Sequence, residues 1–286
     1  MSNRCRQYLA CAGFAISFSL LAQAASAMTR AECERTHQAR SGQSGKDVIW
    51  VPTEEEVVAT MLDLAKIQPR DYVIDLGSGD GRIVIEAVRR HGVQALGVEY
   101  NGELVSLAQC LAEVERVSDK AQFVQADIFE TDFSAATVLM MYLLPDLNLR
   151  LMPTILKMKP GTRVVSHSFL MGDWAPEERK VGDIHNAYLW IVPANAAGNW
   201  TFSQSGGGLT ITAAITQKFQ MLDGSTRAGS RESPIIGGRM RGAQIEMTFH
   251  DAAGMVRRLN GSLEGGRIVA SIAGQAGTIE VVGVRN

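Results

Sequence analysis

The chain has 286 residues, of which 46% are hydrophobic and 20% are charged, and its formal net charge is −2. This composition supports a packed core and excludes a disordered chain, and the length suffices for one large or two modest domains. The slightly acidic balance argues against a protein that holds nucleic acid on a generally basic surface, so we expect no nucleic-acid partner. No stretch after residue 27 is long and apolar enough to cross a bilayer.

The first 27 residues have the layout of an export signal. Arg4 and Arg6 give a basic start, residues 14–22 are apolar, and Ala25-Ser26-Ala27 is typical of a cleavage site. We therefore expect an exported, periplasmic protein whose mature chain begins at Met28. The alternative is an uncleaved helix that anchors the protein to the membrane, and either outcome would associate the protein with the cell envelope.

Residues 28–48 are polar and contain the run Ser41-Gly42-Gln43-Ser44-Gly45, which predicts a flexible lead-in. A helix is expected after Val51-Pro52, with Thr53 as its N-cap and Glu56 completing a capping box. This helix leads into the strand predicted to begin at Tyr72, and it would cover a ligand pocket at that strand.

Cys33 and Cys110 are the cysteines that follow the predicted signal. Two cysteines do not make a disulfide framework. Cys110 lies in the apolar pattern of a helix predicted over residues 103–117, where we expect a buried free thiol.

The segment over residues 72–90 predicts a strand, a glycine-rich turn and a helix, which is how a Rossmann-type nucleotide-binding unit begins. Glycines in the turn Gly77-Ser78-Gly79-Asp80-Gly81 allow the backbone to approach a ligand closely. Asp75 and Asp80 beside this turn would repel a pyrophosphate and attract a cation. Arg82 stands where a dinucleotide site needs its third glycine, which disfavours a nicotinamide oxidoreductase.

Four more strands are expected along the α/β part of the chain, over residues 95–99, 122–128, 136–142 and 162–167. Glu99 ends the first of them, 20 positions beyond Gly79, where a carboxylate can accept from both hydroxyls of a ribose. Alternation of these strands with helices predicts a doubly wound parallel sheet, with its ligand at the carboxyl ends of the strands.

From Asn199 onward the helical pattern is replaced by alternation of apolar and polar residues. Several short strands, with turns expected at Asp223-Gly224, Asn260-Gly261 and Gly265-Gly266, predict a small antiparallel β domain, a sandwich or a partial barrel. We divide the chain into an α/β domain over residues 49–194 and a β domain over residues 195–286, and expect no catalytic group in the β domain.

The stretch from Val51 to Trp174 resembles one branch of the class I, seven-β-strand S-adenosylmethionine-dependent methyltransferases. This branch comprises the mitochondrial protein-lysine N-methyltransferases that modify the ATP synthase c-subunit and the adenine nucleotide translocase, together with bacterial relatives. The matching segments are Val51-Pro52-Thr53 with residues 56–58, then residues 75–84, 97–101, Tyr142-Leu143-Leu144-Pro145 with Asn148, residues 159–167 and residues 171–174.

The resemblance implies S-adenosyl-L-methionine as the cofactor and assigns roles by position. Asp127 would hold the adenine amino group, Tyr142 would offer its ring to an ammonium or sulfonium, and Asn148 would steer the acceptor amine. The other cofactor contacts implied are Asp75, Gly77, Ser78, Gly79, Gly81, Glu99, Tyr100 and Ile128. The acceptor pocket implied is formed by Thr53, Leu143, Leu144 and Pro145.

Three functions stay open at this stage. Protein-lysine N-methylation is favoured by the Tyr142–Pro145 segment, a small-molecule methyltransferase would share the same cofactor residues, and a non-catalytic envelope protein could use the fold as a scaffold.

The five histidines form no metal set, and for His167 we expect a structural hydrogen bond. The oligomeric state does not follow from the sequence.

Overall fold

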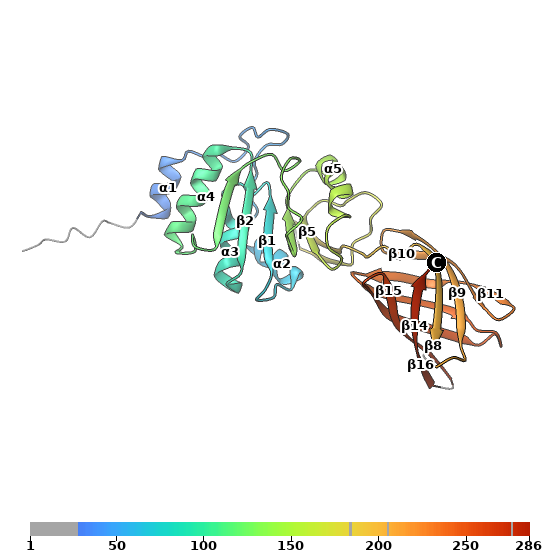
Figure 1. Ribbon diagram of the computed structural model, residues 1–286. Helices are drawn as coiled ribbons and strands as arrows, with labels where there is room; N and C mark the ends of the chain where they lie inside the picture. The colour runs from blue at the N-terminus through green and yellow to red at the C-terminus, as the bar shows by residue number, and fades with distance from the viewer. Residues whose placement is uncertain (1–27, 183–184, 205, 276) are drawn as a thin grey trace, which may run out of the picture.

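The computed structural model describes residues 28–182, 185–204, 206–275 and 277–286 (Figure 1). The predicted signal over residues 1–27 lies outside the described residues. Among the helices that are described, none combines the length and apolar character needed to cross a membrane. The described strands form two sheets, one of seven strands in the α/β part and one that closes into a barrel.

The seven-stranded sheet has the order β3-β2-β1-β4-β5-β7-β6. Its strands are β1 (Tyr72–Leu76), β2 (Gln94–Glu99), β3 (Ala121–Gln125), β4 (Val138–Met141), β5 (Arg163–His167), β6 (Glu178–Val181) and β7 (Asn186–Ile191). The pairings among β1 to β5 are parallel, whereas β7 runs antiparallel to both β5 and β6. The strand order reverses between β1 and β4, which is where doubly wound sheets bind their ligands. The predicted Rossmann-like sheet is confirmed.

Helices cover both faces of this sheet. They are α1 (Arg30–Thr36), α2 (Glu55–Ala65), α3 (Arg82–His91), α4 (Gly102–Val114) and α5 (Pro145–Ile155). Alternate strand residues point to opposite faces, so Val73 packs with α1 to α4 while its neighbour Ile74 packs with α5. The two apolar clusters fix the sheet rigidly and hold the carboxyl ends of β1, β2 and β4 together.

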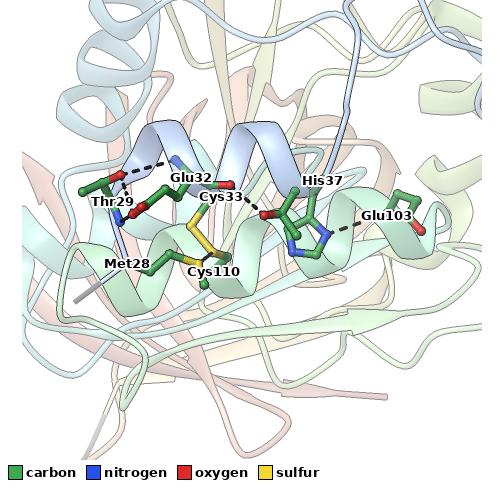
Figure 2. The surroundings of a disulfide bond; sticks show 8 residues. Met28, Thr29, Glu32, Cys33, His37, Glu103 and Cys110 are labelled. Carbon is green, nitrogen blue, oxygen red and sulfur yellow. Dashed lines mark hydrogen bonds and ion pairs between the residues drawn. A yellow bond between two sulfur atoms is a disulfide. The ribbon is translucent and has the colours of Figure 1, made fainter. Parts of the chain in front are cut away.

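The segment expected to be a flexible lead-in contains a helix and a disulfide, so that expectation is wrong. Thr29 caps α1 and forms a capping box with Glu32. The helix packs along α4, where Cys33 is bonded to Cys110 (Figure 2). Cys110 is therefore not a free thiol: the two cysteines are 77 positions apart in sequence, and only the packing of α1 on α4 brings them together.

Thr53 is not the N-cap of α2, which is a second correction. The cap position is taken by Glu54, whose side chain makes no capping hydrogen bond. The Thr53 hydroxyl instead lies 3.3 Å from Nδ1 of the buried His167 and shares a hydrogen bond with it. The structural hydrogen bond expected for His167 is thus confirmed.

The C-terminal part is a closed antiparallel barrel, which confirms the predicted β domain and excludes an open sandwich (Figure 1). Its strands are β8 (Gly198–Gln204), β9 (Thr210–Lys218), β10 (Met221–Ala228), β11 (Arg231–Pro234), β12 (Ile236–Arg241), β13 (Gln244–His250), β14 (Val256–Glu264), β15 (Arg267–Gly274) and β16 (Gly277–Arg285). The barrel closes because β9, at one end of the strand order, pairs with β10, which also pairs with β12. Large side chains such as Trp200, Phe202 and Phe249 are fully buried in its interior.

Two of the three turns expected in this part are wrong. Asp223-Gly224 lies inside β10 and Asn260-Gly261 lies inside β14, whereas Gly265-Gly266 does connect β14 to β15. A Cβ on Gly224 would come within 2.0 Å of the Ala214 carbonyl oxygen. These glycines therefore allow neighbouring strands to approach closely, as glycines in strand interiors often do.

Candidate active site

The glycine turn after β1 is held against the end of β2. The amides of Gly77 and Ser78 both donate to the Val98 carbonyl oxygen, at 2.8 and 3.1 Å. Gly79 has φ +55°, a left-handed conformation that glycine adopts without the strain a side chain would cause. Gly81 also has a positive φ, but a Cβ there would meet the Phe123 ring at 2.6 Å. Gly81 therefore allows α3 to pack closely on β3 and does not face the cavity.

Glu99 connects the second strand to this turn. Its Oε2 accepts from the Gly79 amide at 3.0 Å, and its Oε1 accepts from the Asn101 amide at 2.9 Å. Each carboxylate oxygen has lone pairs to spare, so the side chain can still accept from two hydroxyls of a ribose. Glu99 lines the cavity described below, and its role toward a ribose stays a prediction.

Asp75 is buried, with 1% of its surface exposed, and lies at the end of β1. Its Oδ2 has no hydrogen-bond partner among the described residues. Burial, with the charges of Glu99 and Asp80 nearby, raises the pKa of this carboxyl to about 8. The carboxyl is therefore protonated at neutral pH, and a cation brought beside it would favour its ionisation.

Asp80 does not act as the second free acid that the sequence suggests. Its carboxylate is bound by Arg82, whose Nη2 donates to Oδ2 at 2.6 Å. Nη1 of the same guanidinium donates to the Thr53 carbonyl oxygen at 2.7 Å. Arg82 thus neutralises Asp80 and ties the glycine turn to the segment before α2, which explains an arginine in place of a third glycine.

A cavity lies beside this turn at the carboxyl ends of the strands. The predicted residues that line it are Thr53, Asp75, Gly77, Ser78, Glu99, Tyr100, Asp127, Ile128, Tyr142 and Leu143. Gly79 borders the Trp50 indole instead, since a Cβ on it would lie 2.3 Å from the Trp50 Nε1. The unpartnered oxygen of Asp75, the glycine turn and the remaining lone pairs of the Glu99 carboxylate fit an S-adenosylmethionine molecule.

Three predicted residues on the acceptor side do not line this cavity. Leu144 is 48% exposed, and Pro145 forms the first turn of α5. Asn148 is fully buried, and its Nδ2 donates to Ser166 Oγ at 3.3 Å. Asn148 therefore packs behind the wall of the cavity, its Oδ1 has no hydrogen-bond partner among the described residues, and its role toward an acceptor amine stays a prediction.

Tyr142 begins an aromatic cluster at the ends of β4 and β5. The centroid of its ring lies 3.8 Å from that of His167 and 6.2 Å from that of Phe169. Burial and the neighbouring His185 lower the pKa of His167 to about 4, so its imidazole is neutral at neutral pH. A neutral ring beside Tyr142 leaves this wall of the cavity without positive charge.

Sequence reasoning missed several residues of the cavity, among them Lys46 and Trp50. Lys46 forms an ion pair with Asp127, and this pair lowers the pKa of the Asp127 carboxyl. Trp50 covers the glycine turn. Lys46 lies in the polar lead-in, and Trp50 follows it directly before Val51-Pro52-Thr53, where its aromatic side chain was the available signal.

A parallel sheet with a glycine turn after β1 and an acid closing β2 defines a class I S-adenosylmethionine-dependent methyltransferase. The model of the ANTKMT methyltransferase domain matches residues 75–178. A protein-lysine N-methyltransferase of Saccharolobus islandicus is 45% identical over 151 residues, which cover 51% of this chain and 94% of that protein. The chain belongs to this family of methyltransferases and is an enzyme that uses S-adenosylmethionine.

Two further relatives widen the comparison. A solved structure described as an RNA methyltransferase from Salinibacter ruber, in complex with S-adenosyl-L-homocysteine, is 45% identical with a TM-score of 0.50, covering 51% of this chain and 95% of that chain. The human lysine N-methyltransferase of the ATP synthase c-subunit is 29% identical over 129 residues, covering 45% of this chain and 54% of that protein. The names of the relatives thus differ in the methyl acceptor.

Proposed function

We propose that this enzyme methylates lysine side chains of proteins. The observation that carries the proposal is the charge beside the acceptor pocket. Glu54, Glu55 and Glu56 are exposed and follow Thr53, which lines the cavity. Three adjacent carboxylates attract a basic peptide segment and repel the phosphates of RNA. The protein-lysine N-methyltransferase named among the relatives supports the same acceptor.

The wall of the cavity prepares a lysine for attack. A lysine amine with an ordinary pKa of about 10.4 must lose its proton before it can act as a nucleophile. Buried Leu143 and the ring of Tyr142 form an apolar surface that disfavours the charged amine. The neutral His167 behind Tyr142 adds no charge that would repel an approaching cation.

Bound S-adenosylmethionine supplies an electrophilic methyl group on a sulfonium. The chain's task is to hold the amine in line with that methyl and to exclude water. Burial raises the pKa of the Tyr142 hydroxyl, which therefore stays neutral at physiological pH. Its ring face can stabilise the positive charge shared between sulfur and nitrogen during transfer.

We also propose that the protein is exported and works in the cell envelope. The signal pattern over residues 1–27 and the Cys33–Cys110 disulfide support this location, because disulfides persist in oxidising compartments. Cell fractionation with an antibody to the barrel tests it. Recovery of the protein in the cytosol with an intact residue 1–27 segment would contradict export.

A transfer assay tests the acceptor. The full chain is incubated with methyl-labelled S-adenosylmethionine and either a protein extract, an RNA extract or a small-molecule extract of the same cells. We expect label in protein, released by acid hydrolysis as methylated lysine. Label confined to RNA or to small molecules would contradict the proposal, and the second result would identify a small-molecule methyltransferase.

A charge variant separates an effect on acceptor binding from an effect on cofactor binding. Replacing Glu54, Glu55 and Glu56 together by glutamine should raise the KM for a lysine-rich peptide and leave the Kd of S-adenosylhomocysteine unchanged. A triple variant at exposed acids of the barrel, Asp223, Glu264 and Glu280, is the matched control. Equal KM values for the two triple variants would contradict a role for the three glutamates.

A further inference from the structure

A hairpin ahead of α2 lies across the cofactor cavity. Residues 43–52, called the strap below, contribute much of its lining. Within and beside the strap, the Trp50 amide donates to the Gln43 carbonyl oxygen at 2.9 Å, and the Gly45 amide donates to the Val48 carbonyl oxygen at 2.8 Å. These bonds give the strap a defined shape with Lys46 at its tip.

Lys46 contacts Asp127, which is predicted to bind the adenine amino group, and Tyr100, which is a predicted cofactor contact. Its ammonium pairs with the Asp127 carboxylate and lies 5.3 Å from the centroid of the Tyr100 ring. Asp127 cannot accept from an adenine amino group in the same direction while it holds this ammonium. The same ammonium lies over the Tyr100 ring, of which half the residue surface stays exposed.

Trp50 occupies the other end of the cavity. Its Nε1 lies 2.3 Å from the position that a Cβ on Gly79 would take, so the indole packs against the backbone of the glycine turn. With the strap in this position the cavity measures about 100 Å³. Sites for small molecules typically measure about 300–1,000 Å³, so the strap must move before a cofactor can enter.

Both ends of the strap are fastened to the methyltransferase sheet. Upstream, the Cys33–Cys110 disulfide holds α1 to α4, thirteen positions before Lys46 (Figure 2). Downstream, Arg82 donates to the Thr53 carbonyl oxygen. A short tether keeps the local concentration of Lys46 at Asp127 high.

We propose that the strap is an autoinhibitory gate, in which Lys46 and Trp50 compete with the cofactor for Asp127 and for the glycine turn, and which the Cys33–Cys110 disulfide holds closed. The apparent affinity for the cofactor is then the intrinsic affinity reduced by the fraction of chains with an open gate. The inference rests on the proposed cofactor contacts of Asp127 and Gly79. It makes the redox state of the compartment a control on cofactor loading.

Calorimetry with S-adenosylhomocysteine tests the competition on the full, oxidised chain. Loss of an exposed ion pair should open the gate enough for Lys46→Gln to bind about 2–5-fold more tightly than the wild type. The control Lys157→Gln, at an exposed lysine after α5, should not change the Kd. Equal or weaker binding by Lys46→Gln overturns the gate. The variant Glu99→Ala tests the placement of the cofactor separately. If it binds S-adenosylhomocysteine as tightly as wild type, the cofactor placement is wrong, whatever the effect of Lys46→Gln.

Hydrogen exchange gives a readout that does not depend on affinity. Saturating S-adenosylhomocysteine should accelerate exchange of the Gly45 and Trp50 amides, because the hairpin is displaced. Slower exchange would show that the strap closes over the cofactor as a cover, which overturns the gate.

Reduction tests the tether. A dithiol such as dithiothreitol gives two electrons and two protons to the disulfide, leaving two cysteine thiols and a cyclic dithiothreitol disulfide. We expect reduction to tighten binding of S-adenosylhomocysteine by wild type about 2–5-fold, comparable with the loss of the ion pair. The variant Cys33→Ser/Cys110→Ser should bind like the reduced chain with or without reductant. Unchanged or weaker binding on reduction overturns the role of the disulfide.

Discussion

Asp75 should give the cofactor affinity a pH dependence that calorimetry can measure. Its carboxyl has an ordinary pKa of 3.8 and a pKa of about 8 in the folded chain, caused first by burial. Below pH 8 the carboxyl keeps its proton, whereas a neighbouring ammonium or sulfonium requires the carboxylate. Binding at neutral pH therefore releases a proton from Asp75.

The magnitude follows from this shift. Each pH unit below the raised pKa costs about 1.4 kcal/mol to ionise the carboxyl, which corresponds to about tenfold in Kd. Between pH 6 and pH 7 we therefore expect the Kd for S-adenosylhomocysteine to fall about tenfold as pH rises. Titrations in buffers of different ionisation enthalpy should report about one proton released per ligand bound.

Asp75→Asn is the matched variant, because the amide keeps the shape of the side chain and cannot ionise. It should bind more weakly at pH 7.5 and lose the pH dependence. A wild-type Kd that is constant between pH 6 and pH 7, or a variant that keeps the wild-type slope, would refute the role given to Asp75.

Three other changes have effects that the structure predicts. Replacing Cys33 and Cys110 by serine should lower the free energy of unfolding by roughly 2–4 kcal/mol, since the bond closes a loop of 77 positions; urea titration measures it. Gly261→Ala should cost roughly 1–3 kcal/mol, because its Cβ would lie 2.4 Å from the Ala270 Cβ; thermal melting of the barrel measures it. The unfolded chain protonates His167 near pH 6.5 and the folded chain only near pH 4, so the His167 contribution to stability should fall by roughly 2 kcal/mol between pH 6.5 and pH 5. The Asp75 carboxyl keeps its proton over this range only in the folded chain and raises stability by roughly the same amount as pH falls. Relative to wild type, His167→Gln should therefore gain roughly 2 kcal/mol of stability as pH falls from 6.5 to 5, which urea midpoints measure.

Each of these predictions has a control. The stability of the double serine variant should not change with reductant. If reductant also leaves the stability of wild type unchanged, the prediction for the disulfide is wrong. Ser262→Ala, beside Gly261 on the same strand, should melt within about 2 °C of wild type. An equal loss of thermal stability in Ser262→Ala and Gly261→Ala would contradict the prediction for Gly261. A His167→Gln chain whose stability changes with pH in the same way as that of wild type would contradict the prediction for His167.

Local patterns were sufficient for the methyltransferase sheet. The apolar run before Gly77 and the helical spacing after Arg82 each depend on neighbours in the chain, and both were predicted close to their observed bounds. Glu99 was found from its distance in sequence to Gly79, because the βαβ unit has a regular length. The antiparallel β domain followed from alternation, which left a sandwich and a partial barrel open, and the hairpin of β6 and β7 before it was not predicted.

Turn signals failed where a glycine serves a contact between strands. Asp223-Gly224 and Asn260-Gly261 have the composition of turns, yet each lies inside a strand. The reason for each glycine is a backbone or side chain of a neighbouring strand, which no local pattern contains. The burial of Asn148 could not be predicted either, because it depends on contacts with Ser166, 18 positions away in sequence.

The sequence by itself determined the class of enzyme, its cofactor and the order of its elements, because these depend on short runs of residues with characteristic spacing. The tertiary structure alone decided that Cys33 meets Cys110, that Arg82 joins the turn to Thr53, and that Lys46 reaches Asp127. Each of these pairs is separated by tens of positions along the chain. Their contacts arise from how helices and strands pack, and that packing is a property of the whole core.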